Sequence, residues 1–364
     1  MQKHTHTHTH THTHTHTHFF IGTLAQLILP RSMKMLLFFL LSLFHFNPSL
    51  SLKICSFNVR SFGETKIARP EVIDAVVKMV SRCDIMLLME IKDSKNRVCP
   101  LLVEKLTSQL KGPKEEYRCV ASKRLGRNNY KEQYAFIYRQ DQVLVKQTYQ
   151  YPDTQPGDED VFSREPFIIW FQSPKTAVSE FAFIPLHTTP DTAVREIDEL
   201  YDVHLDVKQR WKIENFIFMG DFNAGCSYVP KKQWKNIRLR TYSEFLWLIG
   251  DKNDTTVKNT TRCPYDRIVV RGQKLIQAVV PHSVNIFDFQ EEFQMTEEQA
   301  LGVSDHFPVE FELKAKGGFF NWLKSKFSRK RRPRRTTQQD HEHARSSYLA
   351  QRYTDANRSR RRLV

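Results

Sequence analysis

The sequence predicts an α/β protein in which strands predominate, and two observations lead to this prediction. Short apolar runs recur along residues 52–313 and end abruptly at polar residues, which is typical of buried strands. Between these runs lie two longer segments whose apolar residues follow helical spacing. No Pro-, Gly- or Ser-rich linker interrupts the region, so we interpret it as one domain of about 260 residues.

The first expected strand covers residues 54–57 and ends at Asn58. The first helix begins at Pro70, and its apolar side chains have the spacing of one helix face: Val72, Ile73, Val76, Val77 and Val80. The run at residues 85–89 follows and ends at Glu90. A buried strand that stops at an amide or a carboxylate delivers that group to the rim of a sheet.

The second half repeats this pattern. The remaining expected elements are strands at residues 134–138, 167–171, 181–186, 215–219 and 309–313 and a helix at residues 192–211. One of these strands ends at His187, and another runs into Asp221 and Asn223. Asp305 and His306 precede Phe307 and Pro308, just before the last strand. The polar residues at the strand ends form one set of candidate site residues.

This set has the composition of a metal-dependent hydrolase. Hard oxygen ligands suit Mg²⁺, Mn²⁺ or Ca²⁺, and the candidates are Asn58, Glu90, Asp221, Asn223 and Asp305. His187 and His306 are candidate acid and base groups because imidazole titrates near neutral pH. Glu132 and Asp266, which lie in polar-aromatic contexts, are the carboxylates expected to orient the two rings. In a phosphodiester hydrolase, one imidazole would accept a proton from water and the other would protonate the leaving 3′ oxygen.

The positive charge of the chain is concentrated at its C-terminus. The formal net charge is +15, but residues 314–364 contain 16 Lys and Arg against 3 Asp and Glu. We interpret residues 314–364 as a basic tail, in which aromatic residues at 319–327 precede a basic run at 329–335 that contains five arginines and a lysine. This pattern predicts a short amphipathic helix that binds anionic surfaces, followed by a disordered arm, although a plain solvated tail is an open alternative.

Residues 1–51 are expected to lie outside the folded domain. They begin with a His-Thr repeat, which we interpret as a translated repeat upstream of a true start at Met33 or Met35. From there, Lys34 and the apolar residues 36–46 predict a signal peptide, cleaved after Ser51. A membrane anchor is the less favoured alternative, because the apolar run is short. Secretion would make the six cysteines potential disulfide partners, and no CxxC pair indicates a zinc site.

The chain resembles the deoxyribonuclease I family. The resemblance rests on motifs that occur in the order expected of that family: NVRSFGE, MEIKDS, LGRNNYKEQYAFIY, FSREPF, PLHTTP, GDFNAGCSYV, CPYDRIVVRG and SDHFPVEF. These motifs cover nearly all of residues 53–313. The resemblance implies a four-layer α/β sandwich, in which two packed mixed β-sheets are flanked by helices and DNA binds across the sheet edges.

The resemblance also implies roles for individual residues. His187 and His306 would be the acid/base pair, with Glu132 and Asp266 as their carboxylate partners. The metal and the scissile phosphate would be held by Asn58, Glu90, Asp221, Asn223 and Asp305. The DNA contacts implied are Arg60, Lys92, Asn128, Tyr130 and Arg164, and the structural calcium ligands implied are Asp160, Glu165 and Asp254. A disulfide between Cys226 and Cys263 fits the family, and the other four cysteines stay unassigned.

The activity implied is a secreted endodeoxyribonuclease that needs Ca²⁺ and Mg²⁺, with Mn²⁺ as a substitute. It would cut double-stranded DNA and chromatin with little sequence specificity, leave 5′-phosphate and 3′-hydroxyl ends, and act as a monomer in DNA catabolism and apoptotic DNA fragmentation. Two features depart from deoxyribonuclease I: Lys92 replaces a groove-contacting Arg, and the small CxxC loop is absent.

Several alternatives are open at this point. GDFN and SDHFPV also occur in abasic-site endonucleases, phosphoinositide phosphatases and sphingomyelinases of the wider superfamily. A catalytically inactive DNA- or actin-binding module is a further alternative, but it would require loss of a catalytic residue, and every motif position is filled. The tail would add attraction to chromatin or anionic membranes and, in a retained protein, a route to the nucleus. Inhibition by actin is left open.

Overall fold

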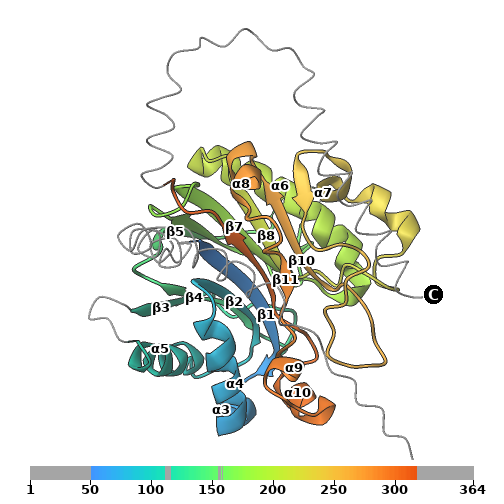
Figure 1. Cartoon of the computed structure of the whole chain (residues 1–364). Helices are drawn as coiled ribbons and strands as arrows, with labels where there is room; N and C mark the ends of the chain where they lie inside the picture. Colours follow the sequence, from blue (N-terminus) through green and yellow to red (C-terminus); the bar gives the residue numbers. More distant parts are fainter. Residues whose placement is uncertain (1–50, 111–115, 155–156, 158, 318–364) are drawn as a thin grey trace, which may run out of the picture. The chain divides into compact units, whose positions relative to one another are not determined.

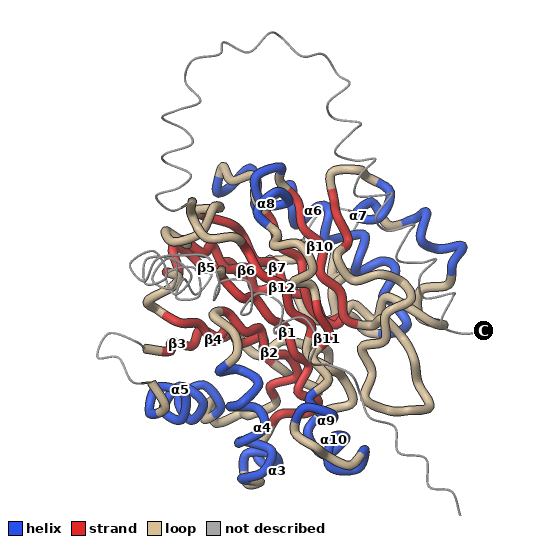
Figure 2. Tube along the Cα trace, viewed as in Figure 1, coloured by secondary structure: helices blue, strands red, loops and turns tan. Residues whose placement is uncertain are grey.

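The computed structural model describes residues 51–110, 116–154, 157 and 159–317. Two β-sheets pack face to face at the centre of this region, and helices cover the outer face of each sheet (Figures 1 and 2). The predicted four-layer α/β sandwich is therefore confirmed. The expected leader and most of the basic tail, including its amphipathic segment, lie outside the described residues.

The first sheet has six strands in the order β11-β12-β1-β2-β4-β3. They are β1 (Leu52–Phe62), β2 (Ile85–Ile91), β3 (Tyr117–Ala121), β4 (Gln133–Arg139), β11 (Asn285–Ile286) and β12 (Val309–Leu313). Strand β1 pairs parallel with β2 and antiparallel with β12. The four strands expected here from sequence are confirmed. Strands β3 and β11 are not predicted from the sequence, because β3 is half exposed and β11 has only two residues.

The second sheet also has six strands, in the order β5-β6-β7-β8-β10-β9. They are β5 (Leu144–Gln150), β6 (Phe167–Gln172), β7 (Glu180–His187), β8 (Phe216–Asp221), β9 (Phe245–Trp247) and β10 (Asp266–Arg271). Strands β7 and β8 run parallel, whereas β8 and β10 run antiparallel. His187 and Asp221 are the last residues of their strands, as the sequence pattern predicted.

The helices lie on the two outer faces, except α8 (Gln273–Ala278), which packs Leu275 and Ala278 into the core between the sheets. They are α3 (Glu64–Ile67), α4 (Pro70–Ser81), α5 (Val98–Ser108), α6 (Ala193–Trp211), α7 (Arg238–Thr241), α8 (Gln273–Ala278), α9 (Phe289–Glu292) and α10 (Glu297–Val303), with 3₁₀ turns at Pro190–Thr192 and Lys231–Asn236. All five apolar residues expected on the inner face of α4 are buried. The helix expected at residues 192–211 is α6, which begins one residue later.

Three apolar cores hold the layers together. The central core lies between the sheets and includes Ile54 and Leu87 of the first sheet and Phe183 and Ile217 of the second. A second core packs the helices α4 and α5 on the first sheet, and a third packs α6 on the second sheet. Side chains of a strand alternate between two cores because successive residues point to opposite faces. Burial on both faces makes the central strands almost continuously apolar, which explains why sequence alone detects them.

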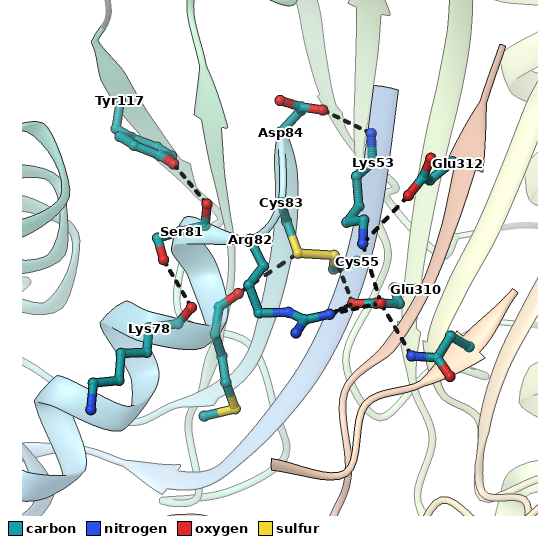
Figure 3. Close-up of a disulfide and its surroundings, with 12 residues drawn as sticks. Lys53, Cys55, Lys78, Ser81, Arg82, Cys83, Asp84, Tyr117, Glu310 and Glu312 are labelled. Atoms are coloured by element: carbon teal, nitrogen blue, oxygen red, sulfur yellow. Dashed lines mark hydrogen bonds and ion pairs between the residues drawn. A yellow bond between two sulfur atoms is a disulfide. The ribbon is translucent and has the colours of Figure 1, made fainter. Parts of the chain in front are cut away.

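Three disulfides join the described cysteines. The expected Cys226–Cys263 bridge is present, and the four cysteines left unassigned pair as Cys55–Cys83 and Cys99–Cys119. Figure 3 shows the Cys55–Cys83 bridge, which joins β1 to the turn before β2 and lies beside the buried carboxylate of Glu310. Glu310 receives charge-assisted hydrogen bonds from Arg82 at 2.9 Å and Lys53 at 3.4 Å (Figure 3). The carboxylate is therefore neutralised on the first sheet, away from the strand ends that carry the site.

Ordered contacts continue slightly beyond the expected domain end at Leu313. The amide of Lys314 donates to the carbonyl of Ala278 at 2.7 Å, and the amide of Lys316 donates to that of Lys175 at 2.8 Å. The first compact unit of the chain accordingly includes residues up to Lys316. Within the described residues, no helix has the length and apolar character needed to span a membrane.

Candidate active site

Asp221 lies at the centre of the candidate site. It is the last residue of β8, where the strand register places it opposite His187 of β7 on one side and Asp266 of β10 on the other. Its carboxylate is buried, with 2% of the residue exposed. The sheet itself therefore gathers an imidazole and two carboxylates that are 34 or more positions apart in sequence.

Two histidine–carboxylate pairs converge on Asp221. The Nδ1 atom of His187 lies 2.6 Å from Oε1 of Glu132, and the Nδ1 atom of His306 lies 2.7 Å from Oδ2 of Asp266. The two Nε2 atoms face the same oxygen of Asp221, at 3.6 Å from His187 and 3.5 Å from His306. The structure thus brings together all four residues expected to form the acid/base pairs.

The charges of the pairs influence one another. Burial opposes a charged imidazole, but the carboxylates of Asp266 and Asp221 outweigh it and raise the pKa of His306 to about 10. The pKa of His187 is also raised, because Glu132 outweighs the effect of burial. Burial raises the pKa of Asp221, but the two imidazoles overcome this effect and the pKa is lowered. Each carboxylate therefore favours a protonated ring next to it, and each ring favours an ionised carboxylate.

The candidate metal ligands adjoin this centre. The side-chain amide of Asn58 donates to Glu90 Oε1 and to Asp221 Oδ2, at 3.1 Å in both cases. Asp221, Asp266 and His306 also place one ligating atom each within 4.8 Å of one another. This donor set, rich in carboxylate oxygens and partly buried, fits a hard divalent cation. Asn223 turns its amide away, to the carbonyl of Thr188 at 3.1 Å.

Strained backbone places several of these groups. Glu90 and Asn223 have positive φ values of 57° and 46°, and Arg60 and Ser61 have values of 47° and 52°. The pairing of β1 with β2 shifts register between Asn58 and Phe62, because the bulge at Arg60 and Ser61 interrupts the ladder. Glu90 lies within β2, one residue before its end, and the amide of Ser61 donates to its carboxylate at 2.8 Å.

Some supporting residues gave no recognisable pattern in the sequence. The hydroxyl of Tyr134 accepts from the His187 amide at 2.9 Å and donates to the carbonyl of Arg164 at 3.2 Å. The hydroxyl of Ser304 donates to the Asn58 carbonyl at 2.6 Å. Ser304 directly precedes Asp305 in the SDHFPVEF motif, so only its position next to site residues could have indicated such a role.

Arg164 lies behind the site instead of on its open surface. Only 7% of the residue is exposed, and its Nε atom donates to the His187 carbonyl at 2.9 Å and lies 3.1 Å from Oε1 of Glu132. The guanidinium therefore neutralises and orients the carboxylate that orients His187. The phosphate contact expected of Arg164 stays a prediction.

The other expected DNA contacts lie on the open side. Tyr130 is 48% exposed, and the ammonium of Lys92 lies 3.9 Å from the centre of its ring and donates to the Ser61 hydroxyl at 3.0 Å. Asn128 is exposed, and the guanidinium of Arg60 lies 3.8 Å from Asp305. These side chains form an accessible rim next to the buried centre.

The expected calcium ligands have other partners in the structure. Asp160 forms an ion pair of 2.7 Å with Arg127, and Glu165 is partly buried. Asp254 accepts three hydrogen bonds through Oδ1: from the amide and the hydroxyl of Thr256, at 3.0 and 2.6 Å, and from the Cys263 amide at 3.2 Å. Calcium binding by these three residues stays a prediction.

Two packed mixed sheets with acids, amides and imidazoles at their common edge define a hydrolase of the endonuclease/exonuclease/phosphatase class. Residues 55–306 match the model of the Endonuclease/Exonuclease/phosphatase family. The chain is 60% identical over 301 residues to deoxyribonuclease gamma of Homo sapiens, covering 83% of this chain and 97% of the relative. It is 57% identical over 303 residues to deoxyribonuclease gamma of Mus musculus, covering 83% and 96%.

A more distant relative is deoxyribonuclease-1 of Equus caballus, at 49% identity over 266 residues, covering 73% of this chain and 93% of the relative. These similarities extend over nearly the whole length of each relative. The chain therefore belongs to the deoxyribonuclease I branch of the Endonuclease/Exonuclease/phosphatase family.

Proposed function

We propose that this protein is an endodeoxyribonuclease that hydrolyses phosphodiester bonds of double-stranded DNA with little sequence specificity and leaves 5′-phosphate and 3′-hydroxyl ends. The observation that carries the proposal is the convergence of two histidine–carboxylate pairs on Asp221. The names of the relatives support DNA as the substrate.

Hydrolysis needs one proton taken from water and one given to the leaving oxygen, and the two pairs supply one group for each transfer. In this scheme, one imidazole is neutral before the reaction, and its Nε2 atom accepts the proton as the water oxygen bonds to phosphorus. Nε2 of the other imidazole donates its proton to O3′ as the P–O3′ bond breaks. Glu132 and Asp266 hold the rings through Nδ1, which leaves both Nε2 atoms directed at the reacting groups.

A divalent cation fits the acidic side of the site. Glu90 and Asp221 would hold it, with Asn58, Asn223 and Asp305 holding the metal or the scissile phosphate, and Mg²⁺ with Ca²⁺, or Mn²⁺ as substitute, suits these oxygen donors. When bound, it supplies positive charge that stabilises the phosphate as negative charge builds up. The residues of the chain orient the substrate and move the protons.

The accessible rim would bind the DNA backbone and the minor groove through Arg60, Lys92, Asn128 and Tyr130. Contacts to phosphate and groove shape carry little sequence information, so cutting should vary with groove width and stiffness. A monomer provides the complete set of residues for this scheme.

We further propose that the protein is secreted through the endoplasmic reticulum. Three disulfides within the described residues support an oxidising compartment. There it would act on extracellular DNA and on chromatin from dying cells, in DNA catabolism and in apoptotic fragmentation. The tail would add attraction to chromatin or to anionic membranes, and it would support nuclear import if some protein were retained.

The first test is conversion of supercoiled plasmid by the secreted protein, with Ca²⁺ plus Mg²⁺ or with EDTA. His187→Asn and His306→Asn each keep a polar group near Nδ1 and remove Nε2. We expect each to lower the nicking rate by about 10²–10⁴-fold, the usual contribution of a general acid or base. His282→Asn is the matched control because His282 is exposed and lies outside the site.

Nicking that resists EDTA, or that survives both substitutions, would contradict the proposed mechanism. A folded wild-type protein that does not cut DNA would redirect the assay to phosphoinositides and sphingomyelin, and then to DNA binding without cleavage.

A further inference from the structure

Lys66 of α3 connects two segments that carry site residues. Its ammonium donates to the carbonyls of Val59 at 2.7 Å, Arg60 at 2.6 Å and Val303 at 2.6 Å. A lysine ammonium has three protons to donate, and these three bonds use all of them. Val59 and Arg60 belong to β1, whereas Val303 is the last residue of α10.

Each accepting carbonyl lies where regular structure leaves it without its usual partner. The left-handed backbone of Arg60 and Ser61 interrupts the ladder between β1 and β2, so local carbonyls turn away from it. Val303 ends a helix, and the last carbonyls of a helix have no partner within it and attract cations. The ammonium of Lys66 therefore provides hydrogen bonds both to the carbonyls at the bulge in β1 and to the carbonyl at the end of α10.

Both segments continue directly into the site. Asn58, which donates to Glu90 and Asp221, immediately precedes Val59. Asp305 and His306 follow two and three residues after Val303. The only other hydrogen bond that joins the two segments directly, within the described residues, is the one from the Ser304 hydroxyl to the Asn58 carbonyl at 2.6 Å. These two connections act together with the Arg60–Asp305 ion pair and the pairing of β1 with β12 to set the spacing between the Asn58 side and the His306 side of the site.

We propose that Lys66 is a positioning residue that fixes the end of β1 against the end of α10 and so holds the Asn58 side and the Asp305–His306 side of the site in register. This proposal rests on the proposed function for its kinetic test. The surroundings agree with it, because burial, together with the charge of Arg60, lowers the pKa of Lys66 to about 8. On an ordinary solvated surface, a lysine ammonium is fully hydrated, and burial does not lower its pKa.

The test compares Lys66→Met with wild type in plasmid nicking and in Mn²⁺ binding, the latter measured by titration calorimetry without DNA. Methionine keeps an unbranched apolar stem and removes all three donors. Lys314→Met is the matched control, because Lys314 donates to the carbonyl of Gln277 at 2.8 Å and follows the end of β12 opposite to Asp305 and His306.

We expect Lys66→Met to lower kcat by about tenfold or more and to leave KM for DNA within about threefold, because misplaced groups slow the chemical step more than they weaken DNA binding. We expect Mn²⁺ affinity to fall by about fivefold or more, in line with the loss of a residue that orients a site. Lys314→Met should stay within about twofold of wild type in every value, since it acts at a distance from the site.

A kcat and an Mn²⁺ affinity of Lys66→Met within twofold of wild type would overturn the proposal. If wild type does not cut DNA, the proposed function fails, and the Mn²⁺ affinities alone decide the role of Lys66. Lys66→Gln, which keeps an amide donor, replaces Lys66→Met under the same thresholds if the methionine variant is unfolded at the assay temperature.

Discussion

At the scale of single residues, the site is built on unfavourable backbone. Glu90 and Ser61 have φ values of 57° and 52°, although neither is a glycine or an asparagine. Such conformations cost on the order of 1–3 kcal/mol each and persist only where surrounding contacts enforce them. Here the contact is the 2.8 Å hydrogen bond from the Ser61 amide to the Glu90 carboxylate, which joins the two strained positions. The strained backbone near the ends of β1 and β2 thus orients the Ser61 amide and the Glu90 carboxylate toward each other.

Lys92 is the residue most suited to a test of groove recognition. Its ammonium is held between the Tyr130 ring and the Ser61 hydroxyl. An ammonium is a point charge, whereas a guanidinium presents a planar fork that also stacks on aromatic rings. We expect Lys92→Arg to lower KM by about two- to fivefold and to increase the variation of cutting with minor-groove width, since Arg favours narrow grooves. Sequencing the ends of a digested random-sequence library measures the cutting profile.

Lys95→Arg is the control for this substitution. Lys95 is exposed and forms its 2.7 Å ion pair with Glu64, away from Tyr130. The same cutting profile for Lys92→Arg and Lys95→Arg would show that Lys92 does not contact the groove.

The sequence predicted the side chains of the site better than their arrangement. Local context predicts Glu132 and Asp266 as partners of the histidines, and the structure places both at hydrogen-bonding distance from the expected rings. The burial of Arg164 behind Glu132 could not be predicted, because an Arg in a motif carries no information about which side of a carboxylate it occupies. Lys66 was missed for a similar reason: its partners are backbone carbonyls, which leave no trace in a sequence.

At the scale of elements, the strand-end pattern succeeded because of parallel pairing. Strands β1 and β2 run parallel, as do β7 and β8, so their C-terminal ends lie at a common edge. His187 and Asp221 end their strands and Glu90 lies one residue before the end of β2, but the strand end expected at Asn58 is wrong, because β1 continues to Phe62. Disulfide pairing is harder to predict from the sequence than strands are. The pairing of Cys55 with Cys83 and of Cys99 with Cys119 depends on the distance between elements in space, and six cysteines allow 15 pairings.

Helix α6 supplies a prediction about acid stability. His204 lies on its buried face, 1% exposed, with its ring 4.7 Å from that of Phe216 and 5.4 Å from that of Phe245. Burial, assisted by the charges of Arg271 and Lys208, lowers the pKa of His204 to about 3. The folded state therefore binds this proton less readily than the unfolded chain, whose histidine pKa is about 6.5. The neutral ring stabilises the fold above pH 6.5, and this contribution is lost as the pH falls toward 3.

We expect His204→Phe to resist acid better than wild type. Between pH 7 and pH 5, the free energy of unfolding of the variant should gain about 2 kcal/mol relative to wild type, because only wild type takes up the proton on unfolding. Urea unfolding in EDTA at both pH values measures the difference. The exposed His282, replaced by Asn, controls for histidine loss in general. A difference between His204→Phe and wild type that does not change with pH would contradict this prediction.

At the scale of the whole molecule, charge is divided between the domain and the tail. Residues 53–313 contain nearly equal numbers of acidic and basic residues, whereas residues 318–364 contain 14 Lys and Arg against 3 Asp and Glu. The site on the sheet edge is itself rich in carboxylates, so we expect the basic tail to compensate for weak long-range attraction of the domain to DNA.

Truncation after Gly317 keeps the ordered contacts of Lys314 and Lys316 and removes the rest of the tail. We expect the kcat on naked plasmid to stay within about twofold, because every residue of the proposed chemistry remains. Cleavage of chromatin and of DNA bound to anionic vesicles should fall by about fivefold or more, and the salt dependence of DNA binding should weaken, because fewer phosphates are neutralised. A second variant, in which Ser replaces the basic residues at 329–335, distinguishes the effect of the charges from the effect of the aromatic segment at 319–327. If the truncated and full chains cut chromatin and vesicle-bound DNA at equal rates, the tail has no role in substrate choice. Binding of DNA would then depend on the nearly neutral domain alone.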